Sequence, residues 1–216
     1  AEAQGLAAAG VREINLVAQD STSWGKDLAP IPGAGRQKLH DLVRALDAVD
    51  GLDWIRLLYV YPSAVTDELI DALAGSKRVL PYVDVPLQHA SDRMLERMKR
   101  GSTAERQRRL VAKLRERIPG VTLRTTFIVG FPGETEEDFS QLLDFVAESR
   151  FDRVGIFRYS DEEGTAAAAL DAKVPRTLAR ERYRRLAKLQ AGIQAEKLTA
   201  LVGSEARVLV DVTIGA

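Results

Sequence analysis

Five short apolar runs alternate with segments of helical periodicity, and this alternation restricts the chain to an α/β fold. The runs cover residues 13–18, 54–60, 82–86, 121–129 and 153–159. Between the first two, Leu39, Leu42, Val43 and Leu46 recur at spacings of three and four, as on one face of a helix. Strands that alternate with helices form βαβ units around a parallel sheet. We therefore predict a parallel α/β sheet or barrel.

Composition narrows the class of protein. The chain has 216 residues, 45% of them hydrophobic, which suits one sizeable core. Lysine plus arginine and aspartate plus glutamate both number 31, so net charge gives no support to nucleic-acid binding. There is no cysteine, which excludes disulfides and thiolate metal sites in these residues. No apolar run is long enough to span a bilayer, and we expect a cytoplasmic protein with no membrane partner.

Both ends of the chain suggest a longer parent. Residues 1–10 lack a basic n-region and read as the middle of a helix, so we expect the chain to begin inside a longer protein. Residues 205–211 alternate as one strand, which cannot stand alone. We predict one domain over residues 1–201 and the start of a truncated β-domain over residues 202–216.

Residues 124–139 run a strand into a glycine-rich turn and then into a helix. Gly130, Pro132 and Gly133 predict a tight turn that exposes its backbone. Thr135 is expected to cap the helix, with Asp138 completing a capping box. Taken alone, the segment indicates no more than a well-formed turn between a strand and a helix.

Residues 176–201 form one long helical stretch rich in arginine, after a strand-free segment over residues 161–175. Arginines invite a nucleic-acid hypothesis. However, Leu178, Leu186, Leu189 and Ile193 make an apolar seam, and acidic residues are interspersed. We favour a solvated helix that docks on the sheet.

Polar and aromatic residues follow each predicted strand, where parallel α/β folds bind ligands. They occupy residues 19–22, 61–63, 86–91, 130–134 and 159–160. Each group has a structural explanation, since Asp20 could close a loop and a lone His89 is usually structural. Together they suit a small ligand with charge and a flat ring. Arg124 shares a strand face with Thr126, Ile128 and Gly130, and if that face is enclosed Arg124 needs a carboxylate or phosphate.

Five segments resemble the radical S-adenosylmethionine methylthiotransferases, in order along nearly the whole chain. They are residues 17–28, 55–62, 84–92 together with 98–101, 124–139 and 157–165. The runs Pro-Leu-Gln-His-Ala-Ser and Tyr-Ser-Asp-Glu-Glu-Gly-Thr resemble the branch called RimO, which modifies a ribosomal protein. The tRNA-modifying branch, MiaB, tends to differ at the first of these runs.

The resemblance implies a partial (β/α) barrel of the radical S-adenosylmethionine type. Its first strand would be missing here, and a long helix and the first strand of a truncated TRAM domain would follow. It implies S-adenosylmethionine and two 4Fe-4S clusters in the parent, one held by a Cys-x-x-x-Cys-x-x-Cys loop. It further implies methylthiolation of the β-carbon of an aspartate in a small-subunit ribosomal protein. Expected partners are that protein, the ribosome or its RNA through the missing TRAM domain, and an electron donor protein.

The resemblance also assigns cofactor contacts. Gln19 and Asp20 would hold the methionyl ammonium, with charge favouring Asp20. Gln88 and Arg124 would meet the ribose hydroxyls and the methionyl carboxylate. The adenine side and the adjoining rim would be formed by Thr126, Gly130, Phe157, Tyr159 and His89.

The missing cysteines set this chain apart from the family pattern, because a cluster of this type needs thiolates. We expect the chain itself to be inactive, and favour a fragment of an active parent over a degenerate relative. Two alternatives stay open: a tRNA adenosine methylthiotransferase, and a cluster-free barrel that only binds protein or RNA.

Overall fold

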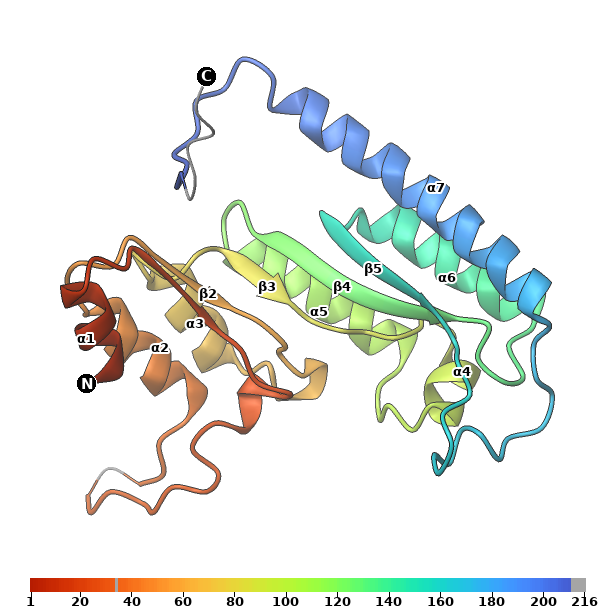
Figure 1. Cartoon of the computed structure of the whole chain (residues 1–216), viewed down its shortest axis with the longest axis horizontal. Coiled ribbons are helices and arrows are strands. Elements are labelled where there is room, and N and C mark those ends of the chain that lie inside the picture. The colour runs from red at the N-terminus through yellow and green to blue at the C-terminus, as the bar shows by residue number, and fades with distance from the viewer. Residues whose placement is uncertain (34, 211–216) are drawn as a thin grey trace.

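The computed structural model describes residues 1–33 and 35–210, and the elements follow the predicted alternation (Figure 1). The strands are β1 Glu13–Leu16, β2 Trp54–Leu57, β3 Tyr82–Asp84, β4 Thr122–Val129 and β5 Arg153–Arg158. The helices are α1 Glu2–Ala8, α2 Leu39–Asp47, α3 Asp67–Gly75, α4 Asp92–Arg97, α5 Ala104–Arg117, α6 Glu136–Ser149 and α7 Arg176–Ala200. Two single 3₁₀ turns, η1 Ser21–Ser23 and η2 Pro62–Ala64, follow the first two strands.

The strands form two parallel sheets within the described residues. One pairs β1 with β2, and the other has the order β3-β4-β5 with Asp84 opposite Arg124. The sheets meet at a parallel bridge between Ile55 and Val79, and the Val60 N–H donates to the Asp84 carbonyl at 2.8 Å. This arrangement confirms the predicted α/β class and a partial barrel that does not close.

Helices cover one face of the strands, while the other face is open (Figure 1). On β4 this division follows the side-chain alternation of a strand. Leu123, Thr125, Phe127 and Val129 are buried, and the residues between them are half-exposed. The Phe127 ring packs edge-on against Phe145, with centroids 6.2 Å apart. The open face therefore carries Arg124, Thr126 and Ile128, as the sequence predicted.

The helix that follows β4 begins as expected. Thr135 caps α6 by accepting from the Asp138 N–H at 3.2 Å, and the Asp138 carboxylate accepts from the Thr135 N–H at 2.8 Å. This reciprocal pair satisfies two backbone donors that a helix start leaves free. The capping box is confirmed, and it fixes where the turn after β4 ends.

Helix α7 lies along α6 and β5 (Figure 1), which confirms that it docks on the sheet. Its buried stripe differs from the apolar seam that the sequence predicted. Leu186 and Ile193 are buried, but Leu178 and Leu189 are only half-buried. The rest of the stripe is Ala179, Arg182 and Gln190. A charged residue in this stripe requires a buried partner, which the turn after β4 supplies.

The predicted strand at residues 205–211 is not present over residues 205–210, which have no regular structure. A lone strand has no ladder of hydrogen bonds to hold it extended. Asp211 and the residues after it lie outside the described part of the chain. A second domain over residues 202–216 remains a prediction. Among the described residues no helix combines the length and apolarity needed to cross a membrane.

Candidate functional site

Hydrogen bonds join the loops after β1 and β2 to each other and to the end of β3. The Ser21 N–H donates to the Tyr59 carbonyl at 3.0 Å, and the Ser21 hydroxyl donates to the Leu58 carbonyl at 2.5 Å. Val60 then bonds to Asp84 across the two sheets. The strand ends therefore form one continuous rim, as the sequence predicted from the polar residues placed there.

Gln88 continues this rim from β3 to β4. Its N–H donates to the Thr126 carbonyl at 2.8 Å, and its carbonyl accepts from the Ile128 N–H at 2.9 Å. Gln88 has a φ of 73°, an unusual conformation for a residue other than glycine. No side-chain hydrogen bond holds the half-buried Gln88 amide among the described residues. The backbone is thus fixed while the side chain stays available to a ligand.

Arg124 has the carboxylate partner that the sequence required. Its Nη1 donates to Asp84 Oδ2 at 2.9 Å, and the Tyr59 N–H approaches the same oxygen at 3.4 Å. The Asp84 side chain is fully buried, whereas 34% of the Arg124 side chain is exposed. Burial raises the pKa of Asp84, and Arg124 opposes that shift.

The second Asp84 oxygen, Oδ1, is buried without a hydrogen-bond partner in the described structure. A buried acceptor with no donor is costly, so a hydroxyl or ammonium group would be stabilised beside it. Asp84 was not among the predicted site residues, although a charged residue inside a short buried strand is a sequence signal for such a role.

Asp20 closes the loop after β1. Its Oδ1 accepts from the Thr22 N–H at 2.9 Å and its Oδ2 from the Ser23 hydroxyl at 2.6 Å, and the Thr22 hydroxyl donates as well. Burial pushes the pKa of Asp20 upward, but these donors outweigh it and hold the pKa below its ordinary value. Gln19 is exposed beside it. No hydrogen bond in the described chain joins Gln19 or Asp20 to Gln88 or Arg124.

His89 lies under the rim and not on its surface. The side chain is fully buried, and its Nδ1 accepts from the Ser91 N–H at 3.0 Å. Because a backbone N–H only donates, Nε2 carries the ring proton and donates to Glu134 Oε1 at 3.0 Å. Both ring nitrogens are therefore used within the protein. In this arrangement the His89 ring bonds to Glu134 and to the Ser91 N–H, and its contact with a cofactor remains a prediction.

Glu134 connects three segments of the chain. Its buried carboxylate accepts from His89 and, through Oε2, from the Gly130 N–H at 2.6 Å and Arg182 Nη1 at 2.8 Å. Arg182 is 2% exposed and also donates to the Glu134 carbonyl at 3.0 Å. The turn after β4 is thus tied to the loop after β3 and to α7. Arg182 had a weak sequence signal, because it lies four residues from both Leu178 and Leu186 of the predicted apolar seam.

A second buried carboxylate, Asp138, lies beside this network. It accepts from the hydroxyls of Ser91 and Thr135, each at 2.6 Å, and from the Arg93 guanidinium. Burial would raise the pKa of Asp138, but the donors from Arg93, Ser91 and Thr135 hold it well below its ordinary value. Asp138 therefore stays ionised and joins α4 to α6.

We expect the stability supplied by Asp138 to be lost in acid. Its folded-state pKa lies below the ordinary value of 3.8, so the contribution is complete above that value and disappears as pH falls beneath it. At about pH 7, Asp138→Asn should lower the free energy of unfolding by about 1.5–3 kcal/mol in urea titrations. The gap from wild type should narrow at about pH 3.

Asp144→Asn, on the exposed side of α6, is the matched control and should change little at either pH. A gap for Asp138→Asn that is the same in acid would contradict the assignment.

Aromatic rings flank the end of β5. Phe157 lies opposite Ile128 in the β4–β5 register and is 60% exposed, so its ring is available. The Tyr159 ring instead packs edge-on against Phe131, with centroids 5.1 Å apart, and its hydroxyl donates to Asp161 at 2.8 Å. Thr126 lies opposite Gly155, and because glycine has no side chain, Gly155 does not cover the open face beside Thr126. This part of the rim can receive a flat ring.

The family follows from a match of residues 1–146 to the model of the radical SAM superfamily. The chain belongs to the radical SAM superfamily. Two solved members share the fold. TsrM, a radical S-adenosylmethionine methyltransferase from Kitasatospora setae, is 24% identical with a TM-score of 0.55, over 73% of this chain and 29% of that one. HemN, the coproporphyrinogen III oxidase of Escherichia coli, is 22% identical with a TM-score of 0.52, over 74% of this chain and 35% of that one.

Curated relatives in this superfamily match almost the whole chain. The ribosomal protein uS12 methylthiotransferase RimO of Sorangium cellulosum is 52% identical over 213 residues, which are 98% of this chain and 44% of the relative. RimO of Geobacter sulfurreducens is 52% identical over 211 residues, 98% of this chain and 46% of the relative. The chain therefore spans less than half the length of these relatives.

The residues of this radical SAM chain fit one of the two implied cofactors. S-adenosylmethionine carries an ammonium, a carboxylate, hydroxyls and a flat base, and the rim offers Asp20, Arg124, the unpartnered Asp84 Oδ1 and Phe157 to such groups. An iron–sulfur cluster does not fit, because the chain has no cysteine. In the described part of the chain no three histidine or acidic side chains gather into a metal site.

Proposed function

We propose that this chain is part of an enzyme that methylthiolates the β-carbon of an aspartate in a small-subunit ribosomal protein. The observation that carries the proposal is the 52% identity over 98% of the chain to a relative that acts on uS12. Because the chain spans 44% of that relative, the activity is proposed for a longer protein that contains these residues. A cytoplasmic location is part of the proposal, since a ribosomal protein is the substrate.

The proposal assigns the rim to S-adenosylmethionine. Asp20 faces the methionyl ammonium, and Arg124 faces the methionyl carboxylate. Gln88 is assigned to a ribose hydroxyl, and a hydroxyl that reached the buried Asp84 Oδ1 would supply its missing donor. The adenine side is assigned to Thr126, Gly130, Phe157 and Tyr159. Support comes from the half-exposed Arg124, the orphaned Asp84 Oδ1 and the exposed Phe157 ring.

The chain's own residues would bind and orient this cofactor. When bound, S-adenosylmethionine supplies a methyl group and, on reductive cleavage, a 5′-deoxyadenosyl radical. His89 acts at one remove, because it holds Glu134, which in turn fixes the Gly130 N–H. The face of β4 behind the rim is buried. We assign the ligands of the two clusters to residues outside this chain. A separate electron donor protein would reduce the clusters.

The test compares two substrates under one set of conditions. A longer protein that contains this chain and a Cys-x-x-x-Cys-x-x-Cys loop is reconstituted anaerobically with iron and sulfide. It then receives either uS12 or an isopentenyladenosine tRNA, each examined by mass spectrometry. We expect a methylthio mass gain on uS12, whereas a gain on the tRNA alone would move the protein to the MiaB branch.

Two further outcomes separate the remaining alternatives. The 216-residue chain treated in the same way should yield no 5′-deoxyadenosine, because it has no thiolate ligands. If the longer protein also yields none, a barrel that only binds protein or RNA is favoured. Detection of 5′-deoxyadenosine from the chain itself would contradict the assignment of the cluster to other residues.

We expect Asp20→Asn in the longer protein to weaken S-adenosylmethionine binding about ten- to a hundredfold. The physical reason is the loss of a charge-assisted hydrogen bond of about 1.5–3 kcal/mol. Isothermal titration calorimetry gives the dissociation constant. Asparagine keeps an acceptor for the Thr22 N–H, so the loop should still close.

Asp27→Asn, at an exposed position further along the same loop, is the control and should bind as wild type does. An unchanged dissociation constant for Asp20→Asn would leave Asp20 with loop closure alone.

A further inference from the structure

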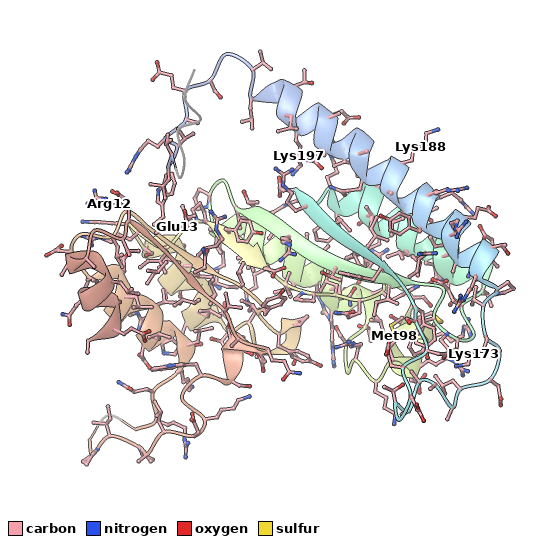
Figure 2. The ribbon with its side chains drawn as sticks, viewed as in Figure 1. Arg12, Glu13, Met98, Lys173, Lys188 and Lys197 are labelled. Carbon is pink, nitrogen blue, oxygen red and sulfur yellow. The ribbon has the colours of Figure 1, made fainter. Side chains whose placement is uncertain are left out.

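A cavity of about 910 Å³ lies between the end of β5 and the start of α7. Five cationic side chains line it: Arg158, Lys173, Arg176, Arg180 and Arg184. Arg176, Arg180 and Arg184 recur every four residues and form one row along α7, about 6 Å apart along the axis. Lys173, labelled in Figure 2, lies in the segment that leads into this helix. We call this cavity the α7 groove.

The arginines of the α7 groove form no ion pairs in the described chain, although Arg176 lies near enough to Asp161 to help lower the pKa of that carboxyl. Arg158, Arg176, Arg180 and Arg184 are exposed and form neither an ion pair nor a side-chain hydrogen bond there. Lys173 pairs with Asp161 at 2.5 Å, and Asp161 is the single carboxylate among the described lining residues.

The other side of α7 differs, because its arginines are paired. Arg182 pairs with Glu134 at 2.8 Å and Arg185 with Glu136 at 2.6 Å. A chain with no net charge therefore places a strong local excess of positive charge on one face. Like charges four residues apart destabilise a helix slightly, so a bound anion would stabilise this row.

Aromatic rings lie beside these cations. Tyr183, one position before Arg184, lines the α7 groove and is 38% exposed. Rows of arginine next to exposed rings are typical of surfaces that bind single-stranded nucleic acid, where phosphates meet guanidinium groups and bases stack on rings. An acidic peptide would use the cations but gain less from the ring.

We infer that the α7 groove binds single-stranded RNA through its phosphates, with a base stacked on Tyr183. Gly130, Phe157 and Tyr159 line both the groove and the rim, so RNA held on α7 lies directly beside the proposed reaction site. The inference rests on the proposed function and adds RNA as a partner, because a ribosomal protein substrate assembles with ribosomal RNA. It differs from binding through a TRAM domain, because these residues lie on the barrel and its last helix.

The test measures binding without turnover, so it is independent of methylthiolation. Fluorescence anisotropy follows a short fluorescein-labelled oligouridylate titrated with the chain at several salt concentrations. We expect the triple variant Arg176→Gln, Arg180→Gln and Arg184→Gln to bind at least tenfold more weakly. Its salt slope should fall by about 2, at about 0.7 for each lost phosphate contact on a single strand.

Three exposed arginines elsewhere provide a control with the same change of net charge. The variant Arg44→Gln, Arg106→Gln and Arg109→Gln should bind RNA nearly as the wild type does. Replacing the three groove arginines by lysine should retain most of the affinity. Tyr183→Leu should weaken binding by about fivefold or more, as expected for one lost stacking contact.

Three outcomes would overturn the inference. They are equal weakening by the groove and control variants, no RNA binding at low salt, and tighter binding of a fluorescein-labelled oligoglutamate than of the RNA. The last result would identify the groove as a site for acidic peptides. Thermal unfolding of each variant checks that it folds, and all the replaced side chains are exposed.

Discussion

Arg182→Ala is expected to lower the free energy of unfolding by about 3–5 kcal/mol, as measured by urea denaturation at neutral pH. The substitution leaves the Glu134 carboxylate fully buried without its cationic partner. The remaining donors, His89 and the Gly130 N–H, do not neutralise its charge. Uncompensated buried charge is one of the few single changes with so large a cost.

Two comparisons isolate this effect. Arg180→Ala, on the exposed side of the same helix, should change stability by no more than about 0.5 kcal/mol. Arg182→Met combined with Glu134→Gln removes both charges and should cost less than Arg182→Ala, because no charge is left unpaired. If Arg182→Ala behaves like Arg180→Ala, the Glu134 network does not tie α7 to the sheet.

Gly130→Ala is expected to cost about 2–5 kcal/mol in the same assay. Gly130 has a φ of 75°, where a side chain costs about 1–2 kcal/mol. An added Cβ would also lie 2.5 Å from the Ala179 Cβ, far inside van der Waals contact. Forcing an extra carbon into a packed contact costs about 1–3 kcal/mol more.

Gly120→Ala separates the two contributions. Gly120 has a φ of 69° and open space around its Cβ position, so alanine there should show the backbone cost alone. Adding Ala179→Gly to Gly130→Ala should recover part of the loss, since the crowded methyl is removed. Equal costs at positions 120 and 130 would show that α7 is not closely packed on the turn.

How far the sequence predicts this molecule depends on the range of each interaction. The alternation of strands and helices and the Thr135–Asp138 capping box depend on near neighbours in the chain, and both are confirmed. The partner of Arg124 was expected as a chemical class, but its pairing with Asp84 depends on the register between β3 and β4.

The burial of His89 and Arg182 could not be predicted. Glu134, which holds both, lies 45 residues from His89 and 48 from Arg182 in sequence. Helical periodicity puts Arg182 in line with Leu178 and Leu186, but it does not show that the charged guanidinium group is buried there. The direction of a side chain that bonds across three segments depends on how those segments pack, and periodicity carries no information on packing.

The division of the strands into two sheets has a consequence for motion. The Asp84 carboxylate meets Arg124 within one sheet and the Tyr59 N–H from the other, so the polar centre of the rim spans the division. Few backbone hydrogen bonds join β2 to β3, among them Val60 to Asp84 at 2.8 Å. Units joined by few bonds open separately in hydrogen exchange, at a lower free energy than global unfolding. A ligand that contacts both Asp20 and Arg124 would bridge the two units and slow exchange across the whole rim.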